Sequence, residues 1–429
     1  MSSALKIAVA GLGTVGVGTV KVLQSHADVL AKRCGCPVEI VAVSARSQKD
    51  RGIDLSSYEW FDDAAQMAQE SNADVFVELI GGSEGVAKDA VMAALQSGKH
   101  VVTANKALIA HHGFELAQLA ESKGVSLNYE AAVAGGIPII KTIREGMAAN
   151  SISRVYGILN GTCNYILTTM RESGRAFNDV LSDAQKLGYA EADPSFDIDG
   201  IDAAHKLAIL ASVAFGSKVD FSAVHVEGIS HVSDIDIQFA TELGYKIKLL
   251  GIASRTNGTI EQRVHPCMVA VKSPIATVEG VFNAVVCDGD AVDTIMQEGR
   301  GAGEGPTASA VVADIVDIAR GISVPTFALP VGGLENLPTS PMADRVGAYY
   351  VRLMLVDKPG VFADVANILR DYQVSIESLL QRVRNPGEPV PAVITTHDTT
   401  EANMVNALNK IAELENVTEA PCMIRIEDF

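Results

Sequence analysis

The sequence has no uninterrupted apolar run of about 18 residues, the length that a helix needs to cross a membrane. The N-terminal stretch also lacks the successive basic, apolar and cleavage-site regions of a secretory signal peptide. We therefore expect neither a membrane span nor a secretory leader.

Positive charge and cysteine are scarce as well. The chain has 34 lysine and arginine residues against 52 aspartate and glutamate residues, for a formal net charge of −18. This balance argues against nucleic acid or an anionic membrane as the main partner, but an anionic cofactor can still be held by local cations and backbone N–H groups. The six cysteines are scattered, and the pair Cys34 and Cys36 lacks a second ligand pair for a metal. Reduced thiols in a cytoplasmic protein are the expectation.

The first part of the chain alternates apolar strands with helices. Helices are predicted between the strands, and such alternation is typical of a parallel sheet covered on both faces. The predicted strands are 6–10, 38–43, 74–80, 100–103 and 126–132.

A glycine-rich turn, Gly11-x-Gly13-x-x-Gly16, lies between the first strand and the first helix. Such glycines allow a tight turn and a close approach of the backbone to a pyrophosphate at a helix N-terminus. In this strand–turn–helix context we predict a Rossmann-type dinucleotide-binding domain over residues 1–135. The alternative is a turn that only packs the helix on the strand.

The second strand ends in Ser44-Ala45-Arg46, where NAD sites usually carry an acidic residue for the ribose hydroxyls. A cation suits a 2′-phosphate instead, so NADP(H) is favoured over NAD(H), unless Arg46 points into solvent. Another strand ends in Thr103 and is followed by Lys106, which we expect to face cofactor or substrate at the carboxyl edge of the sheet. The alternative for Lys106 is an exposed residue at a helix start.

The pattern changes after residue 136. Helices are predicted for 139–148, 165–173, 177–187 and 200–215, with strand-like runs at 154–159, 247–253 and 281–286. We therefore expect an α+β substrate-binding and dimerisation domain over residues 136–320. A further helix over 307–319 either returns to the first domain or bridges the two. Residues 321–345 are rich in proline, glycine and serine and are predicted to form a linker. Residues 346–429 follow the order βαββαβ, a ferredoxin-like arrangement.

The richest cluster of ionisable residues runs from Gly188 to Lys206. It places five carboxylates within twelve residues and then continues as an apolar helical pattern. Asp202 and Lys206 are four residues apart and share one helix face. Such a pair can orient a polar substrate and move a proton. The alternative is a solvated acidic loop followed by a surface ion pair.

Three further turns are candidates for ligand contact. Residues 129–138 form a small, glycine-rich turn whose carbonyl groups suit a hard cation such as Na⁺, or which only crosses between domains. Residues 160–164 contact substrate or cap a helix. Residues 299–307 are a second glycine-rich approach to a helix and are expected to close over the cofactor.

These motifs together resemble homoserine dehydrogenase in its bacterial form with a C-terminal ACT domain. They occur in the order found in that family and cover nearly the whole catalytic region. The matching strings are GLGTVG at 11–16, TANK at 103–106, YEAAVAGGIPII at 129–140, LNGTCNYIL at 159–167, GYAEADPSFDIDGIDAAHK at 188–206, GRGAGEGPTASAVVADI at 299–315 and DKPGVFADVANIL at 357–369.

The resemblance implies reversible NAD(P)H-dependent reduction of L-aspartate 4-semialdehyde to L-homoserine, in the biosynthesis of threonine, methionine and isoleucine. It implies that Lys206 donates and accepts the proton at the reacting oxygen, and that Lys106 supports this proton transfer. The implied substrate-binding residues are Glu191, Asp202 and Asp197. The implied cation-binding residues are Glu130, Val133, Gly135 and Ile137. The implied cofactor contacts are Leu12, Thr14, Val15, Arg46, Gly188 and Gly303, beside Gly11, Gly13, Gly16, Thr103 and Lys106.

The resemblance further implies a homodimer or homotetramer. Feedback inhibition by threonine through the ACT domain is a hypothesis. The alternative is that the C-terminal tail serves only assembly. Two other readings stay open from the residues. An aspartate semialdehyde dehydrogenase needs a nucleophilic thiol, for which Cys163 is the one candidate. A nucleotide-sensing protein without turnover explains the tail but leaves Glu191, Asp202 and Lys206 without a role.

Overall fold

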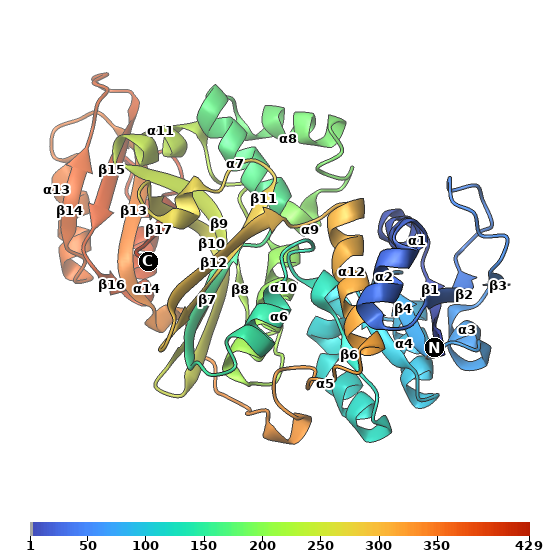
Figure 1. The fold of residues 1–429 in the computed structure, drawn as a ribbon. Helices are drawn as coiled ribbons and strands as arrows, with labels where there is room; N and C mark the ends of the chain where they lie inside the picture. The colour runs from blue at the N-terminus through green and yellow to red at the C-terminus, as the bar shows by residue number, and fades with distance from the viewer. Residues whose placement is uncertain (1–2) are drawn as a thin grey trace.

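The computed structural model describes residues 3–429 and has three parts in series (Figure 1). The first is a six-stranded parallel sheet in the order β3-β2-β1-β4-β5-β6. This order confirms the Rossmann-type prediction, because it reverses at β1, where dinucleotides bind. The strands are β1 (Leu5–Ala10), β2 (Val38–Ser44), β3 (Glu59–Phe61), β4 (Val75–Glu78), β5 (His100–Thr103) and β6 (Leu127–Asn128).

Helices cover both faces of this sheet, and each face buries its own apolar cluster. The helix expected over 307–319 begins earlier and packs on α1, so it returns to the first domain. Gly18 permits this contact, since an added Cβ would lie 2.6 Å from Glu304. The helices are α1 (Thr14–Ser25), α2 (Ala27–Cys34), α3 (Ala64–Glu70), α4 (Val86–Gln96), α5 (Lys106–Lys123) and α12 (Glu304–Ala319).

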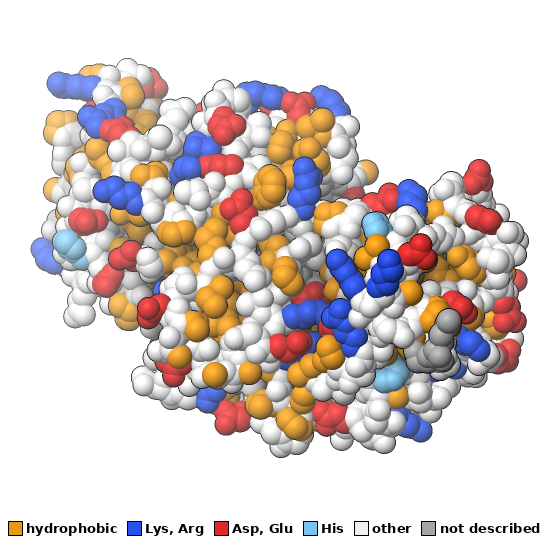
Figure 2. All heavy atoms as spheres, viewed as in Figure 1, with side chains coloured by type: hydrophobic (Ala, Val, Ile, Leu, Met, Phe, Trp, Pro, Cys, Tyr) orange, Lys and Arg blue, Asp and Glu red, His pale blue; other side chains and the backbone are white. Residues whose placement is uncertain are grey.

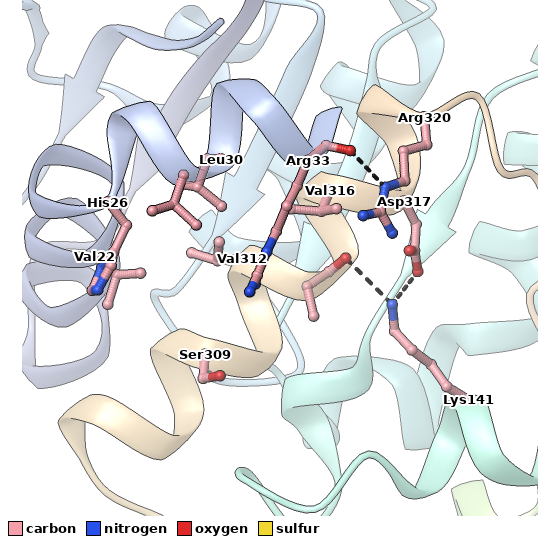
Figure 3. Close-up of a pocket in the computed structure, with 12 residues that line it drawn as sticks. Val22, His26, Leu30, Arg33, Lys141, Ser309, Val312, Val316, Asp317 and Arg320 are labelled. Carbon is pink, nitrogen blue, oxygen red and sulfur yellow. Dashed lines mark hydrogen bonds and ion pairs between the residues drawn. The ribbon is translucent and has the colours of Figure 1, made fainter. Parts of the chain in front are cut away.

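A cavity of about 450 Å³ lies along the seam where α1 and α2 meet α12 (Figure 3). Apolar residues such as Leu30, Val312 and Val316 line it, and polar contacts connect the segments around it. Lys141 forms an ion pair with Asp317 of α12, and Arg320 donates from Nε to the carbonyl oxygen of Arg33 at 3.0 Å. These contacts tie α12 to the start of the second part and to α2. On the face drawn in Figure 2, basic side chains gather near α2 and α12.

The second part is built on a mostly antiparallel sheet, with helices against one face. Three of its strands, β8, β10 and β12, and two of its helices, α9 and α11, were not expected from the sequence pattern. The strands are β7 (Ile152–Ile158), β8 (His225–Val226), β9 (Tyr245–Thr256), β10 (Thr259–Ala270), β11 (Phe282–Gly289) and β12 (Asp293–Arg300). The helices are α7 (Gly161–Ser173), α8 (Phe177–Lys186), α9 (Ser195–Ile198), α10 (Ile201–Phe215) and α11 (Asp234–Glu242).

Two predicted elements are shorter than expected. The strand over 126–132 stops at Asn128, because Glu130–Ala132 turns as a 3₁₀ helix whose polar groups bond to neighbouring segments. The helix over 139–148 is α6 (Ile139–Lys141), which widens into a π-helical turn at Thr142–Gly146.

The C-terminal part has the predicted βαββαβ order, and its sheet runs β17-β13-β15-β14, with every pair antiparallel. The parallel pairing of β17 with β10 joins this sheet to that of the second part, so one sheet runs through both (Figure 1). The elements are β13 (Val346–Val356), α13 (Val361–Asp371), β14 (Ile376–Leu380), β15 (Pro389–Thr396), β16 (Thr399–Thr400), α14 (Glu401–Ala412) and β17 (Cys422–Glu427).

Residues 321–345, predicted as a linker, contain only two 3₁₀ turns, Val331–Gly333 and Met342–Asp344, as regular helix. The segment nevertheless packs against the body of the protein, since Phe327 and Leu334 are buried. Within residues 3–429, no helix is long and apolar enough to span a membrane.

Candidate active site

The glycine-rich turn has the geometry of a phosphate cradle. Gly11 has φ +95°, and an added Cβ would lie 2.4 Å from the carbonyl oxygen of Leu79. A Cβ on Gly16 would lie 1.9 Å from the carbonyl oxygen of Gly11, whereas the space around Gly13 is open. The turn delivers the N-terminus of α1 to a cavity of about 680 Å³, where Thr14 and Val15 line the wall. Free N–H groups at a helix N-terminus favour an anionic phosphate there, so the turn fits a dinucleotide.

Arg46 follows β2 directly and is exposed. Its side chain makes no hydrogen bond or ion pair with any residue in the part of the chain that the structure describes, so it is free for a ligand. Nearby, Arg51 donates from Nε to the carbonyl oxygen of Leu12 at 3.0 Å and also bonds to the carbonyl oxygen of Ser47. Arg51 thereby braces the glycine-rich turn from the adjacent loop. Nothing in the sequence pattern distinguishes this arginine from other loop cations.

Lys106 is the first residue of α5 and lines the same cavity. Asn105 caps the helix by accepting from the Leu108 N–H at 3.1 Å. Thr103 donates its hydroxyl to buried Glu78 at 2.5 Å, which anchors the end of β5. The Lys106 ammonium lies 3.1 Å from Asp202 Oδ1. The predicted carboxyl-edge position therefore brings this lysine to the acidic cluster.

Asp202 and Lys206 lie one turn apart on α10, and both are buried. Lys206 donates from Nζ to Asp202 Oδ2 and to the carbonyl oxygen of Leu159, each at 2.7 Å. Burial acts to raise the pKa of Asp202, but Lys206 and Lys106 hold that pKa well below its ordinary value. Asp202 is therefore an anion that fixes both ammonium groups, which excludes the reading of a solvated surface pair.

Asn160 holds the carboxylates in place, a role that its position before a helix did not reveal. Its Nδ2 donates to Asp197 Oδ1 and to Asp202 Oδ2, each at 2.8 Å. Its Oδ1 accepts from the Cys163 N–H at 2.8 Å, which also makes it the N-cap of α7. Burial, together with the Asp202 charge, raises the pKa of Asp197. The two acids thus differ in proton affinity although one amide bridges them.

The turn between α8 and α9 forms the outer wall of the cavity. Gly188 and Glu191 both line it, and Glu191 is exposed, with no partner for its carboxylate within residues 3–429. Gly303, which has φ +126°, lines the opposite wall immediately before α12. The predicted substrate and catalytic residues therefore all line one cavity. Some predicted cofactor contacts line it as well, namely Thr14, Val15, Lys106, Gly188 and Gly303, whereas others do not, namely Gly11, Leu12, Gly13, Gly16, Thr103 and Arg46.

The predicted cation-binding turn lies beside this cavity. The carboxylate of buried Glu130 accepts the N–H groups of Ile140 and Lys141, each at 2.9 Å. Burial, with a contribution from Asp314, raises the pKa of Glu130 to about 7. The carbonyl oxygens of Val133 and Gly135 accept no hydrogen bond within residues 3–429. That of Ile137 accepts the Ile139 N–H at 2.8 Å. Two free carbonyl groups beside a carboxylate match the oxygen donors of a hard cation.

Cys163 is unsuited to nucleophilic catalysis. Its side chain is buried, and its Sγ donates to the carbonyl oxygen of Asp197 at 3.2 Å. Burial, with the charge of Asp197, raises the pKa of the thiol well above its ordinary value. Because a thiolate is the attacking species, the structure disfavours the thioester route that an aspartate semialdehyde dehydrogenase needs.

The cavity therefore combines a nucleotide cradle, two ammonium groups held by one carboxylate, and two further carboxylates. An ammonium group can stabilise and protonate an oxygen that becomes negative, and carboxylates can bind an α-amino group. This set suits hydride chemistry on a polar amino acid.

Known protein families match nearly the whole chain. A homoserine dehydrogenase NAD-binding domain model matches residues 11–130, a homoserine dehydrogenase model matches residues 138–316, and an ACT domain model matches residues 349–416. Homoserine dehydrogenase of Pseudomonas aeruginosa is 46% identical over 432 residues, which cover 99% of each chain. That of Neisseria gonorrhoeae is 44% identical over 99% of each chain.

Solved structures agree with the family matches. Homoserine dehydrogenase of Thiobacillus denitrificans superposes with a TM-score of 0.93, at 45% identity and 99% and 98% coverage. A hyperthermophilic archaeal homoserine dehydrogenase in complex with NADPH is 28% identical, with a TM-score of 0.63 over 73% of this chain and 97% of its own. Matched along its length in sequence and in fold, this chain belongs to the homoserine dehydrogenase family of NAD(P)-dependent oxidoreductases, in the form that carries an ACT domain.

Proposed function

We propose that the protein reduces L-aspartate 4-semialdehyde to L-homoserine reversibly, as a step in the biosynthesis of threonine, methionine and isoleucine. The observation that carries the proposal is the contact of two lysines, the buried Lys206 and the partly exposed Lys106, with the buried carboxylate of Asp202. Lys206 donates the proton to the aldehyde oxygen in the forward direction and takes it back from the alcohol in reverse. Lys106 stabilises the charge that develops on that oxygen.

Three carboxylates are proposed to bind the substrate and to orient the lysines. The Glu191 carboxylate has no partner among residues 3–429 and lines the cavity, so it suits the substrate α-amino group. Asp197 lines the same cavity and is bridged through Asn160 to Asp202. Asp202 orients both lysines and completes the substrate-binding set. Asp193, in contrast, accepts from Ser195 alone within residues 3–429, in an exposed turn, and we assign it no role in the reaction.

NADP(H) is the proposed cofactor, with NAD(H) as the weaker alternative. The bound nicotinamide supplies the hydride for reduction and accepts it in oxidation. Arg46 supports the preference, because a free guanidinium at the end of β2 can pair with a 2′-phosphate. The archaeal relative solved with NADPH is consistent with this choice.

A monovalent cation such as Na⁺ is proposed at the turn formed by Glu130, Val133, Gly135 and Ile137. The free carbonyl groups of Val133 and Gly135 support it. Activity in buffers that differ only in Na⁺ or K⁺ should then depend on the cation, and equal rates in tetramethylammonium salts would contradict the site.

Feedback inhibition by threonine and assembly as a homodimer or homotetramer are proposed for the ACT-containing chain. Inhibition is best tested on the full chain. A chain ending near residue 340 loses β17, the neighbour of β10, and leaves the edge of β10 unpaired. Light scattering with and without threonine tests the assembly.

Oxidation of NADPH on addition of L-aspartate 4-semialdehyde, with L-homoserine as the product, tests the main proposal. The same assay with NADH ranks the cofactors. A protein that binds NADPH but shows no turnover in either direction would instead be a nucleotide sensor.

A further inference from the structure

Asn283 is a buried polar residue of the active-site cavity with no assigned partner. It lies at the start of β11, with only 2% of its surface exposed, and it lines the cavity. Its side-chain amide makes no hydrogen bond to any residue among 3–429. Buried amides are almost always hydrogen-bonded, because an unpaired one costs the desolvation of its polar atoms. Because the Asn283 amide borders the cavity, a ligand in the cavity can supply the missing hydrogen-bond partner.

Two glycines make room for this amide. A Cβ on Gly301 would lie 2.2 Å from Asn283 Cγ, and a Cβ on Gly161 would lie 3.2 Å from Asn283 Oδ1. The amide therefore occupies a slot between the first residue of α7 and the glycine-rich segment before α12. Both neighbouring segments line the cavity as well.

The surroundings of this slot favour an anionic ligand group. Asp197 and Asp202 reach the start of α7 through side chains only, since both accept from the Asn160 amide and Asp197 also accepts from the Thr162 hydroxyl. The first two N–H groups of α7, on Gly161 and Thr162, donate no hydrogen bond within residues 3–429. They lie at the positive end of a 13-residue helix. The Asn283 amide has its Oδ1 near Gly161, and its Nδ2 would lie 2.3 Å from a Cβ on Gly301, so its N–H adds a third donor on the Gly301 side of the slot.

We propose that Asn283 donates its Nδ2–H to the α-carboxylate of the amino-acid substrate. The charged groups of the cavity then match the substrate end by end. Glu191 and Asp197 take the ammonium, Lys106 and Lys206 take the reacting oxygen, and Asn283 takes the carboxylate. The assignment rests on the amino-acid substrate proposed above. Turnover of L-homoserine by the unaltered protein tests that substrate separately.

Two variants and one substrate analogue test the assignment. Asn283→Ala removes the donor, and Asn283→Asp keeps the shape but replaces the donor with an acidic acceptor. 3-Aminopropan-1-ol is homoserine without its carboxylate and serves as a competitive inhibitor. Asn257→Asp, at an exposed hairpin tip, makes the same chemical change away from the cavity. Thermal unfolding and NADPH titration are measured on every variant to confirm folding and cofactor binding.

We expect Asn283→Ala to raise KM for L-homoserine by about 10- to 100-fold, the usual range for a hydrogen bond to a charged group. The rise should be larger for Asn283→Asp. The Kd of NADPH and the Ki of 3-aminopropan-1-ol should stay unchanged, and Asn257→Asp should match the unaltered protein.

Two results would overturn the assignment. A weaker Kd for NADPH with unchanged KM for L-homoserine would place the amide on the nicotinamide side of the cavity. Equal losses for L-homoserine and 3-aminopropan-1-ol would show that Asn283 does not read the carboxylate.

Discussion

Lys106 of the nucleotide-binding domain forms an ion pair with Asp202 of the second domain, Nζ to Oδ1 at 3.1 Å. The other oxygen of Asp202 accepts from Lys206. One carboxylate therefore organises lysines from two domains that are about a hundred residues apart in the sequence. Because α5 and α10 both contribute, the proposed proton-transfer site is complete only when the two domains are packed together.

Lys206→Ala should lower turnover by at least about 10²-fold, which is the usual size of a general acid–base effect. NADPH binding should persist, because among the described residues the Lys206 ammonium bonds only to Asp202 and to the carbonyl oxygen of Leu159. Steady-state kcat and a fluorescence titration of NADPH measure the two quantities. Near-normal turnover would rule out Lys206 as the proton donor.

Arg46→Ala should weaken NADPH binding by about ten-fold or more, as expected for one charge-assisted contact, and change NADH binding little. Arg51→Ala is the matched comparison. It removes the bond to the Leu12 carbonyl and should weaken both cofactors alike. Equal effects of Arg46→Ala on NADH and NADPH would show that Arg46 does not read the 2′-phosphate.

His205 should make stability depend on pH. It is buried, stacked on Phe221 with ring centroids 4.3 Å apart, and its Nε2 lies 3.2 Å from that of His111. Burial lowers its pKa to about 4, with further lowering by His111 and Lys106 and an opposing effect of Asp202.

Between pH 6.5 and about 4 the unfolded chain binds a proton at His205 that the folded protein does not. The stabilising contribution of neutral His205 to the free energy of unfolding is therefore complete above pH 6.5. It is lost progressively as the pH falls from 6.5 toward about 4. His205→Gln should flatten the decline in unfolding free energy over this range by up to about 1.4 kcal/mol per pH unit. Denaturant unfolding at several pH values measures the slope, with His26→Gln as an exposed control. Parallel curves for His205→Gln and the unaltered protein would contradict the prediction.

Arg425 should be essential for joining the ACT domain to the rest of the chain. Its guanidinium is buried and donates to both oxygens of Glu227, at 2.7 and 2.8 Å, and also to Glu401. Arg425→Ala removes the buried cation between these carboxylates and leaves Glu227 with His225 and Glu401 with the Tyr349 hydroxyl, so it should destabilise the protein by about 3–5 kcal/mol.

Arg382→Ala is the control for Arg425→Ala. It breaks an ion pair with Glu242 in which both side chains are exposed, and it should cost less than about 1 kcal/mol. Urea unfolding compares the two variants, and equal small losses would show that the Arg425 cluster contributes little.

The sequence by itself determined the local structure and the identity of the chemical groups. Gly11, Gly13 and Gly16 predicted the nucleotide-binding turn, because the conformation of such a turn depends on a few consecutive residues. The spacing of Asp202 and Lys206 predicted their contact for the same reason, since helix periodicity alone places them on one face.

Contacts between distant segments were decided only by the tertiary structure. The pairing of β17 with β10 depends on which strand edge is left free after packing. The turn 160–164 predicted a cap or a substrate contact, but the bridge that Asn160 makes to Asp197 and Asp202 depends on distant segments. No local pattern marked Asn283, whose surroundings also come from other segments. The Lys106–Asp202 ion pair likewise forms because domain packing, and not sequence spacing, brings the two side chains into contact.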